Sequence, residues 1–89
     1  MQINWQKDGS GWTASLGNVT LCASPDRTKF GKAARGTKWH ASVSSWDEPT
    51  RTMSRFGRDV YMTLCDSAKD AMLLAERVYS EENQSRRAA

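Results

Sequence analysis

The stretch Trp12-Thr13-Ala14-Ser15-Leu16-Gly17-Asn18-Val19-Thr20-Leu21-Cys22-Ala23, residues 12–23, decides the fold. Apolar and polar side chains alternate in both of its halves, which is typical of β-strands that bury one face. Two turn-prone residues, Gly17 and Asn18, separate the halves, as in a tight β-hairpin. We therefore predict antiparallel strands over 12–16 and 19–23, with one shared inward face made of Trp12, Ala14, Leu16, Val19 and Leu21.

The same alternation outside this hairpin predicts further strands. Ile3 and Trp5 alternate with polar neighbours just before the turn residues 8–11, so they are expected to form the first strand. Residues 38–46 and residues 60–65 show the pattern again, and a basic connector joins them. The inward side chains of these two strands are expected to be Trp39, Ala41, Val43, Val60, Met62 and Leu64.

A helical pattern follows the last predicted strand. Asp66 or Ser67 is a good N-cap, because a short polar side chain can accept a hydrogen bond from the free amides of the first turn. Apolar residues then recur at helical spacing at Ala68, Ala71, Met72, Ala75, Val78 and Tyr79. We predict an α+β fold, in which an antiparallel sheet of four to five strands packs one face against a single C-terminal helix. Residues 1–81 are expected to form one domain and residues 82–89 a flexible tail.

Length and composition restrict the possible functions. The chain has 89 residues, 38% of them hydrophobic, which suits one small domain. Two cysteines and one histidine complete no four-ligand zinc site and leave no spare base beside a Ser-His-Asp set. No carboxylate or nucleophile lies at a recognisable catalytic spacing from His40, so we expect no enzyme, no cofactor and no catalytic or metal-binding residues. No apolar run approaches the roughly 18 residues that span a bilayer, and the N-terminus does not resemble a signal peptide. A cytoplasmic protein without membrane contact is therefore expected.

The net charge of +3 is distributed unevenly. Residues 27–58 carry a net charge of +6, whereas residues 1–26 carry −1 and residues 59–89 carry −2. Such a local excess attracts phosphates or an acidic protein surface, because the fields of neighbouring like charges add. The alternative is that the basic residues only keep two long loops solvated.

Basic and aromatic side chains in this central region are the candidate contact residues. The basic ones are Arg27, Lys29, Lys32, Arg35, Lys38, Arg51, Arg55 and Arg58. The ring-bearing ones are Phe30, His40, Trp46, Phe56 and Tyr61. By strand parity Trp46 faces away from the core, and large anchors beside charge are typical of binding surfaces. For Phe30 and Phe56 the alternative is that each ring pins its loop to the core.

The segment from Asp59 to Ala71, a last strand that leads into a capped helix, resembles the end of many short accessory proteins of bacteriophages and mobile elements. The chain as a whole is similar in kind to small anti-CRISPR and other anti-defence inhibitors. This resemblance implies stoichiometric binding that blocks a nucleic-acid-handling complex of a bacterial host, in the host cytoplasm.

The sequence thus predicts a non-enzymatic binding protein, monomeric or homodimeric, whose partner is a host protein or nucleoprotein complex. The alternative is a small basic domain that binds DNA or RNA directly. In that case the lysines and arginines of residues 27–38 would contact phosphates, and Trp46 or Tyr61 would stack on bases.

Overall fold

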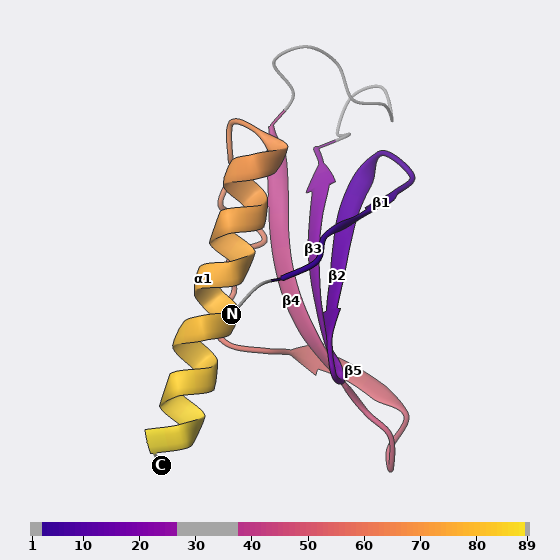
Figure 1. Cartoon of the computed structure of the whole chain (residues 1–89), viewed down its shortest axis with the longest axis vertical. Helices are drawn as coiled ribbons and strands as arrows, with labels where there is room; N and C mark the ends of the chain where they lie inside the picture. Colours follow the sequence, from indigo (N-terminus) through magenta and orange to yellow (C-terminus); the bar gives the residue numbers. More distant parts are fainter. Residues whose placement is uncertain (1–2, 27–37, 89) are drawn as a thin grey trace.

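The computed structural model describes residues 3–26 and 38–88, which form one sheet and one helix (Figure 1). The strands are β1 (Gln6–Asp8), β2 (Gly11–Leu16), β3 (Val19–Pro25), β4 (Trp39–Asp47) and β5 (Thr52–Arg55). They lie in the order β1-β2-β3-β4-β5, and each neighbouring pair is antiparallel. Helix α1 (Ala68–Ala88) lies against one face of the sheet. The predicted α+β fold is confirmed.

The central hairpin forms as its alternation predicts. Gly17 adopts a φ of +65° in the turn, a conformation that glycine tolerates without strain. The register then places Leu21 opposite Ala14 on one side and opposite Val43 on the other. All three side chains are buried, and Leu21 is completely so. This row forms the middle of the core beneath α1.

Glycine is required at position 11 because β2 and β3 approach each other closely there. A Cβ atom at this position would lie 2.7 Å from the carbonyl oxygen of Ala23, a backbone atom that cannot rotate away. Gly11→Ala should therefore lower the free energy of unfolding by about 1 to 3 kcal/mol, as overpacking does. Urea denaturation measures this loss, with Ser15→Ala on the exposed part of β2 as the control. An unchanged denaturation midpoint for Gly11→Ala would show that β2 and β3 are further apart than described.

Helix α1 begins at the predicted cap. The hydroxyl of Ser67 accepts a hydrogen bond from the backbone amide of Asp70, and Asp70 places a negative charge in the first turn. Ala71, Ala75 and Val78 are buried against the sheet. The small alanines let the helix axis approach β3 and β4 closely.

The helix continues through residues 82–88, where we expected a tail without regular structure. Two contacts stabilise this last part. The Arg86 guanidinium donates to Glu82 four residues earlier, at 2.7 Å, and lies 4.5 Å from the centre of the Phe56 ring. The aromatic partner is remote in sequence, so helical spacing alone did not indicate it.

Two strand assignments are wrong. The first strand is Gln6–Asp8 and not the stretch around Ile3 and Trp5, although both of these residues pack against the core. The last strand is Thr52–Arg55, within the stretch expected to be a basic connector. All four residues of β5 are exposed, so no apolar alternation marked it.

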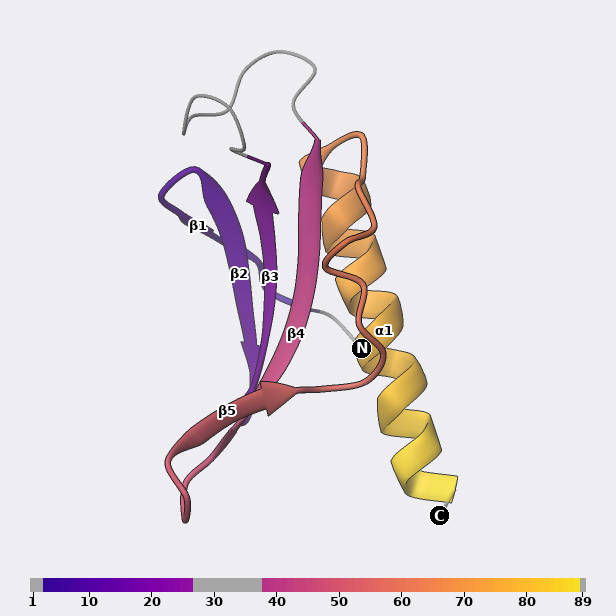
Figure 2. The same ribbon diagram turned by 180° about the vertical axis from the view of Figure 1, so that it is seen from behind.

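Residues 56–65, here called the edge segment, do not form the predicted strand. They run back beside β4 in an irregular path (Figure 2). The Phe56 amide donates to the carbonyl of Val43 at 2.9 Å, and Cys65 exchanges two backbone hydrogen bonds of 2.8 Å with Trp39. The Thr63 amide donates to the carbonyl of Val60, so the chain coils between these anchors. Because of this coil, successive side chains no longer alternate between two faces, and that alternation was the basis for predicting a strand over 60–65.

The coil changes which side chains reach the core. Val60 is buried as predicted, but Met62 is 81% exposed and Leu64 is 51% exposed, so their assignment to the core is wrong. Phe56 is also corrected, since it is 6% exposed and stacks on Tyr79 of α1 with ring centres 5.6 Å apart. The Phe56 ring thus pins the start of the edge segment to the helix. This is the alternative to a contact role that the sequence left open for Phe56.

Candidate interaction surface

The edge segment presents three apolar side chains to solvent. Tyr61, Met62 and Leu64 are 49%, 81% and 51% exposed, and we call them the edge patch. Together with His40 and Asp26 they line an open cavity of about 370 Å³. Exposed apolar groups that lie together on a monomeric protein often mark a binding site, which makes this patch the leading candidate.

Local hydrogen bonds fix the backbone beneath the patch. The side chain of Asp59 accepts from the amide of Tyr61 at 3.0 Å, an Asx turn that starts the coil. Val60 then points into the core, and the Cys65–Trp39 pairing closes the segment. The patch is therefore held at both ends and stands at a defined place on the edge of the sheet.

His40 joins β4 to the edge patch. Its ring stacks on the Tyr61 ring with a centre-to-centre distance of 4.5 Å and an interplanar angle of 10°. Its Nδ1 lies 2.7 Å from the carbonyl oxygen of Tyr61, and its Nε2 lies 3.5 Å from Oδ1 of Asp26. Only 12% of the His40 side chain is exposed. The structure thus brings together two of the predicted contact residues, His40 and Tyr61.

Four of the basic residues predicted for the site lie in the described part of the chain, and three of these are paired with carboxylates. Lys38 forms an ion pair with Asp66, and the hydrogen bond and charge of this lysine lower the pKa of the Asp66 carboxyl. Two more pairs are Arg55 with Asp59 at 3.8 Å and Arg58 with Glu81 at 3.0 Å. These pairs are solvent-exposed and add little stability, but they reduce the positive charge available to a phosphate backbone.

Trp46 and Arg51 lie on the hairpin that joins β4 to β5. The unbroken registers of β3, β4 and β5 place Trp46 on the face away from α1, opposite Met53. The indole nitrogen of Trp46 donates to Glu48, and its side chain is half-buried. Arg51 is exposed in the turn, with a φ of +56°. Neither residue lines the cavity of the edge patch.

Arg27, Lys29, Phe30, Lys32 and Arg35 lie outside the described residues. Their segment, residues 27–37, contains four basic and no acidic residues. The remainder of the chain, with nine basic and ten acidic residues, has a net charge of −1. The two residues that flank this segment are held next to each other, because the amide of Asp26 donates to the carbonyl of Lys38 at 2.7 Å. The whole positive excess therefore belongs to residues 27–37, and Asp26, which precedes them in sequence, lines the cavity of the edge patch.

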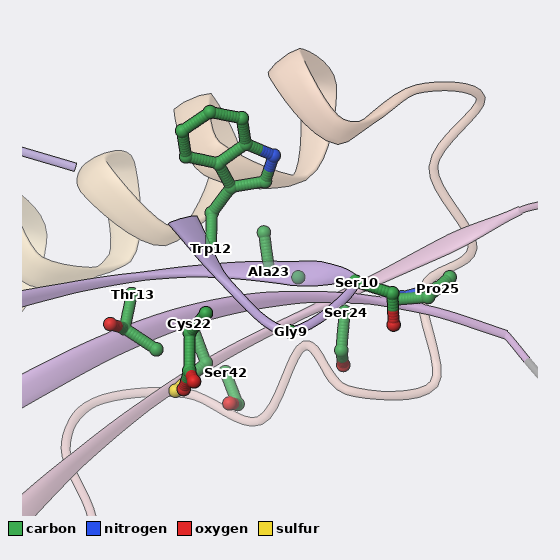
Figure 3. A pocket seen from close by; sticks show the side chains of 11 residues that line it. Gly9, Ser10, Trp12, Thr13, Cys22, Ala23, Ser24, Pro25 and Ser42 are labelled. Atoms are coloured by element: carbon green, nitrogen blue, oxygen red, sulfur yellow. The ribbon is translucent and has the colours of Figure 1, made fainter. Parts of the chain in front are cut away.

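A second and larger cavity, of about 630 Å³, lies at the end of the β1–β2 hairpin. Figure 3 shows Trp12 and Ala23 projecting toward the helix, and Cys22, Ser24 and Ser42 projecting from the opposite face. Burial raises the pKa of the Cys22 thiol, opposed in part by a hydrogen bond with Ser42. The thiol is therefore protonated at neutral pH and is a poor nucleophile. This cavity offers hydroxyl groups but no activated group.

Metal binding is not supported by the arrangement of side chains. Within residues 3–26 and 38–88, no three His, Cys, Asp or Glu side chains lie close enough to hold a metal ion. Burial, followed by the charges of Asp70 and Asp66, raises the pKa of the second thiol, Cys65. Helix α1 is not apolar enough to cross a membrane, and it is the only helix in the described ranges.

Comparisons with known proteins give no family to which the chain belongs. No family model, no curated protein and no solved structure matches it. The arrangement of side chains at the surface is therefore the basis for assigning a function.

Three residues of the surface, Met62, Leu64 and Asp26, were not among the predicted contact residues. Alternation placed Met62 and Leu64 in the core. The aspartate at position 59, which favours a turn, was the signal that could have indicated the coil.

Proposed function

We propose that this chain is a non-enzymatic binding protein whose edge patch contacts a protein of a bacterial nucleic-acid-handling complex and thereby inhibits that complex. The observation that carries the proposal is the exposure of Tyr61, Met62 and Leu64 within four consecutive residues of a well-anchored segment. Apolar and aromatic anchors of this kind supply most of the free energy of protein association. The choice of a defence complex as partner follows from the resemblance to phage anti-defence inhibitors.

The geometry of the patch suits a protein partner. Val60 anchors the backbone in the core, and Met62, two residues later, extends outward. Methionine is flexible and polarizable, so it adapts to the shape of an apolar pocket. Tyr61 adds a ring whose stacking on His40 already fixes its orientation, so little side-chain entropy is lost on binding.

In the part of the chain that the structure describes, the predicted contact cations also favour a protein over a nucleic acid. Lys38, Arg55 and Arg58 are each paired with a carboxylate of the same chain. A nucleic-acid surface instead needs several free cations to displace counterions from phosphates. Cations that are already paired with carboxylates suit the polar rim of a protein interface better than a phosphate backbone.

Capture from a bacterial lysate tests the proposal, with and without nuclease treatment. A protein partner should be retained in stoichiometric amount after the nuclease has removed DNA and RNA. Loss of every captured protein on nuclease treatment would contradict the proposal.

Direct binding of DNA or RNA is the second candidate, and the charge of residues 27–37 favours it. If this segment neutralises phosphates, the affinity for a mixed-sequence oligonucleotide should fall by about tenfold or more between 50 and 200 mM salt. Micromolar binding that does not respond to salt would contradict this candidate.

Substituting two basic residues of that segment should slow association with the protein partner. We expect Lys32→Ser with Arg35→Ser to reduce the association rate by about threefold to tenfold at low salt and to leave the dissociation rate nearly unchanged, because complementary charges chiefly steer the encounter of two proteins. Surface plasmon resonance measures both rates. Unchanged association at low salt would show that the basic excess only solvates the segment.

A further inference from the structure

The cavity of the edge patch combines a carboxylate with apolar and aromatic walls. Its lining residues come from three parts of the chain: Asp26 follows the end of β3, His40 lies on β4, and the edge segment supplies Tyr61, Met62 and Leu64. The edge segment runs beside β4 at this edge of the sheet (Figure 2). The volume of about 370 Å³ lies near the lower end of the range of roughly 300 to 1,000 Å³ that ligand pockets have, so the cavity suits one side chain or a small molecule.

The Asp26 carboxylate lacks a close hydrogen-bond donor in the part of the chain that the structure describes. Nε2 of His40 lies 3.5 Å from its Oδ1, which exceeds the length of about 2.7 to 3.2 Å that is typical of an N–H···O hydrogen bond. Lys38, whose carbonyl accepts from the Asp26 amide, directs its ammonium group to Asp66 instead. Only 20% of the Asp26 side chain is exposed, and a carboxylate that is largely removed from water is stabilised by a cation that donates to its oxygens. This wall of the cavity therefore favours a positively charged ligand.

The other walls favour a cation that is planar and has an apolar stem. The Tyr61 ring is 49% exposed, and its stacking on His40 at 4.5 Å fixes its orientation. A guanidinium group stacks on such a ring, because its planar charge is attracted to the aromatic face. Met62 and Leu64 offer apolar surface to the methylene groups of a long charged side chain. Arginine has the fork of donors, the planar charge and the stem, whereas the ammonium group of lysine is compact and strongly hydrated.

We infer that this cavity receives an arginine side chain of the partner protein, with the guanidinium group on the Asp26 carboxylate and the stem against Met62 and Leu64. That the arginine belongs to a partner rests on the proposed function, whereas the preference for a guanidinium group is a property of the free protein. Arginine is enriched among the residues that dominate the binding energy of protein interfaces. The apolar side chains of the edge patch thus surround one charged contact that selects the partner residue.

Titration of the free protein with N-acetyl-arginine amide, followed by NMR of the backbone amides, tests the inference. The amide signals of Tyr61, Met62 and Leu64 should shift as this probe binds. N-acetyl-citrulline amide has nearly the same shape without the charge, so it should bind at least about tenfold more weakly, because charge-assisted hydrogen bonds are roughly twice as strong as neutral ones. N-acetyl-lysine amide keeps the charge but lacks the planar fork, so it should bind at least about threefold more weakly than the arginine probe. These comparisons use the wild-type protein and depend on no variant.

Asp26→Asn tests the carboxylate itself. It removes the charge and keeps the shape of the side chain, so the arginine probe should bind about tenfold or more weakly, and the affinity for the citrulline probe should stay nearly unchanged. Asp8→Asn is the matched control, because it makes the same change of net charge at an exposed residue of β1 outside this cavity. Its affinity for the arginine probe should stay within about twofold of the wild-type value.

Three results would overturn the inference: equal binding of the arginine and citrulline probes, equal binding of the arginine and lysine probes, or full affinity of Asp26→Asn for the arginine probe. The titration needs no partner protein. A failure of the proposed function would therefore appear only in the lysate capture, and a failure of this inference only in the titration.

Discussion

Replacing Leu21 with alanine should lower the free energy of unfolding by about 2 to 5 kcal/mol. Leu21 is completely buried at the middle of β3, paired with Ala14 on β2 and Val43 on β4, and covered by α1. The substitution removes apolar contacts and leaves a cavity that neighbouring strands cannot close. A domain of this size typically has only about 5 to 15 kcal/mol in total, so a large part of its stability would be lost.

Urea denaturation followed by tryptophan fluorescence measures this effect. Leu73→Ala is the matched control, because this leucine lies on α1 with its side chain 51% exposed. The control should change the free energy of unfolding by no more than about 0.5 kcal/mol. If Leu21→Ala lowered the free energy of unfolding by less than about 1 kcal/mol, helix α1 would not be packed on the row formed by Leu21, Ala14 and Val43.

Replacing Met62 and Leu64 together with aspartate should weaken partner binding by about a hundredfold or more. Each anchor of an interface typically contributes at least about 1 to 2 kcal/mol, and a buried carboxylate without a partner adds a further penalty. Both side chains are at least half exposed in the free protein, so the fold should be retained. Isothermal titration calorimetry with the captured partner gives the affinity, and circular dichroism melts give the stability.

Met53→Asp is the control for this double variant. Met53 lies on β5 and is 54% exposed, so this substitution places one negative charge, half of what the double variant adds, on an apolar residue of the same edge of the sheet. Its affinity should stay within about threefold of the wild-type value, since contacts outside an interface centre are nearly neutral. Equal loss in both variants would mean that added negative charge, and not the edge patch, controls binding.

The sequence was sufficient to predict the parts of the fold that alternation and capping govern. Leu21 and its neighbours alternate strictly around Gly17, and a one-residue slip would expose the whole apolar set, so one register is specified. The helix was equally well marked by Ser67 and by the spacing of Ala71, Ala75 and Val78. These signals are local and consistent with one another.

The edge segment could not be predicted in this way, because a tertiary contact and a side-chain turn override its alternation. Val60 does enter the core, but the Asp59–Tyr61 hydrogen bond coils the chain before Met62 can follow it inward. Strand β5 was missed for the opposite reason, since backbone pairing with β4 forms it without a buried face. Both errors concern residues near the candidate surface, which explains why its apolar anchors were assigned to the core.

The ion pairs of the candidate surface could not be predicted from the sequence either. Counting charges by segment separated Arg55 and Arg58 from the carboxylates of the next segment, but folding pairs them with Asp59 and Glu81. Glu81 is remote from Arg58 in sequence, so only the position of α1 reveals the pair. The excess that remains lies in residues 27–37.

The most direct test of the edge patch as a contact surface is the rate at which Met62 is oxidised by dilute hydrogen peroxide, free and in complex with the captured partner. Met62 is 81% exposed and Met53 is 54% exposed, so both should oxidise readily in the free protein, and Met53 serves as an internal reference. In the complex, Met62 should be oxidised at least about tenfold more slowly while the rate for Met53 stays unchanged. Equal rates for Met62 in the free and bound protein would contradict the assignment of the edge patch.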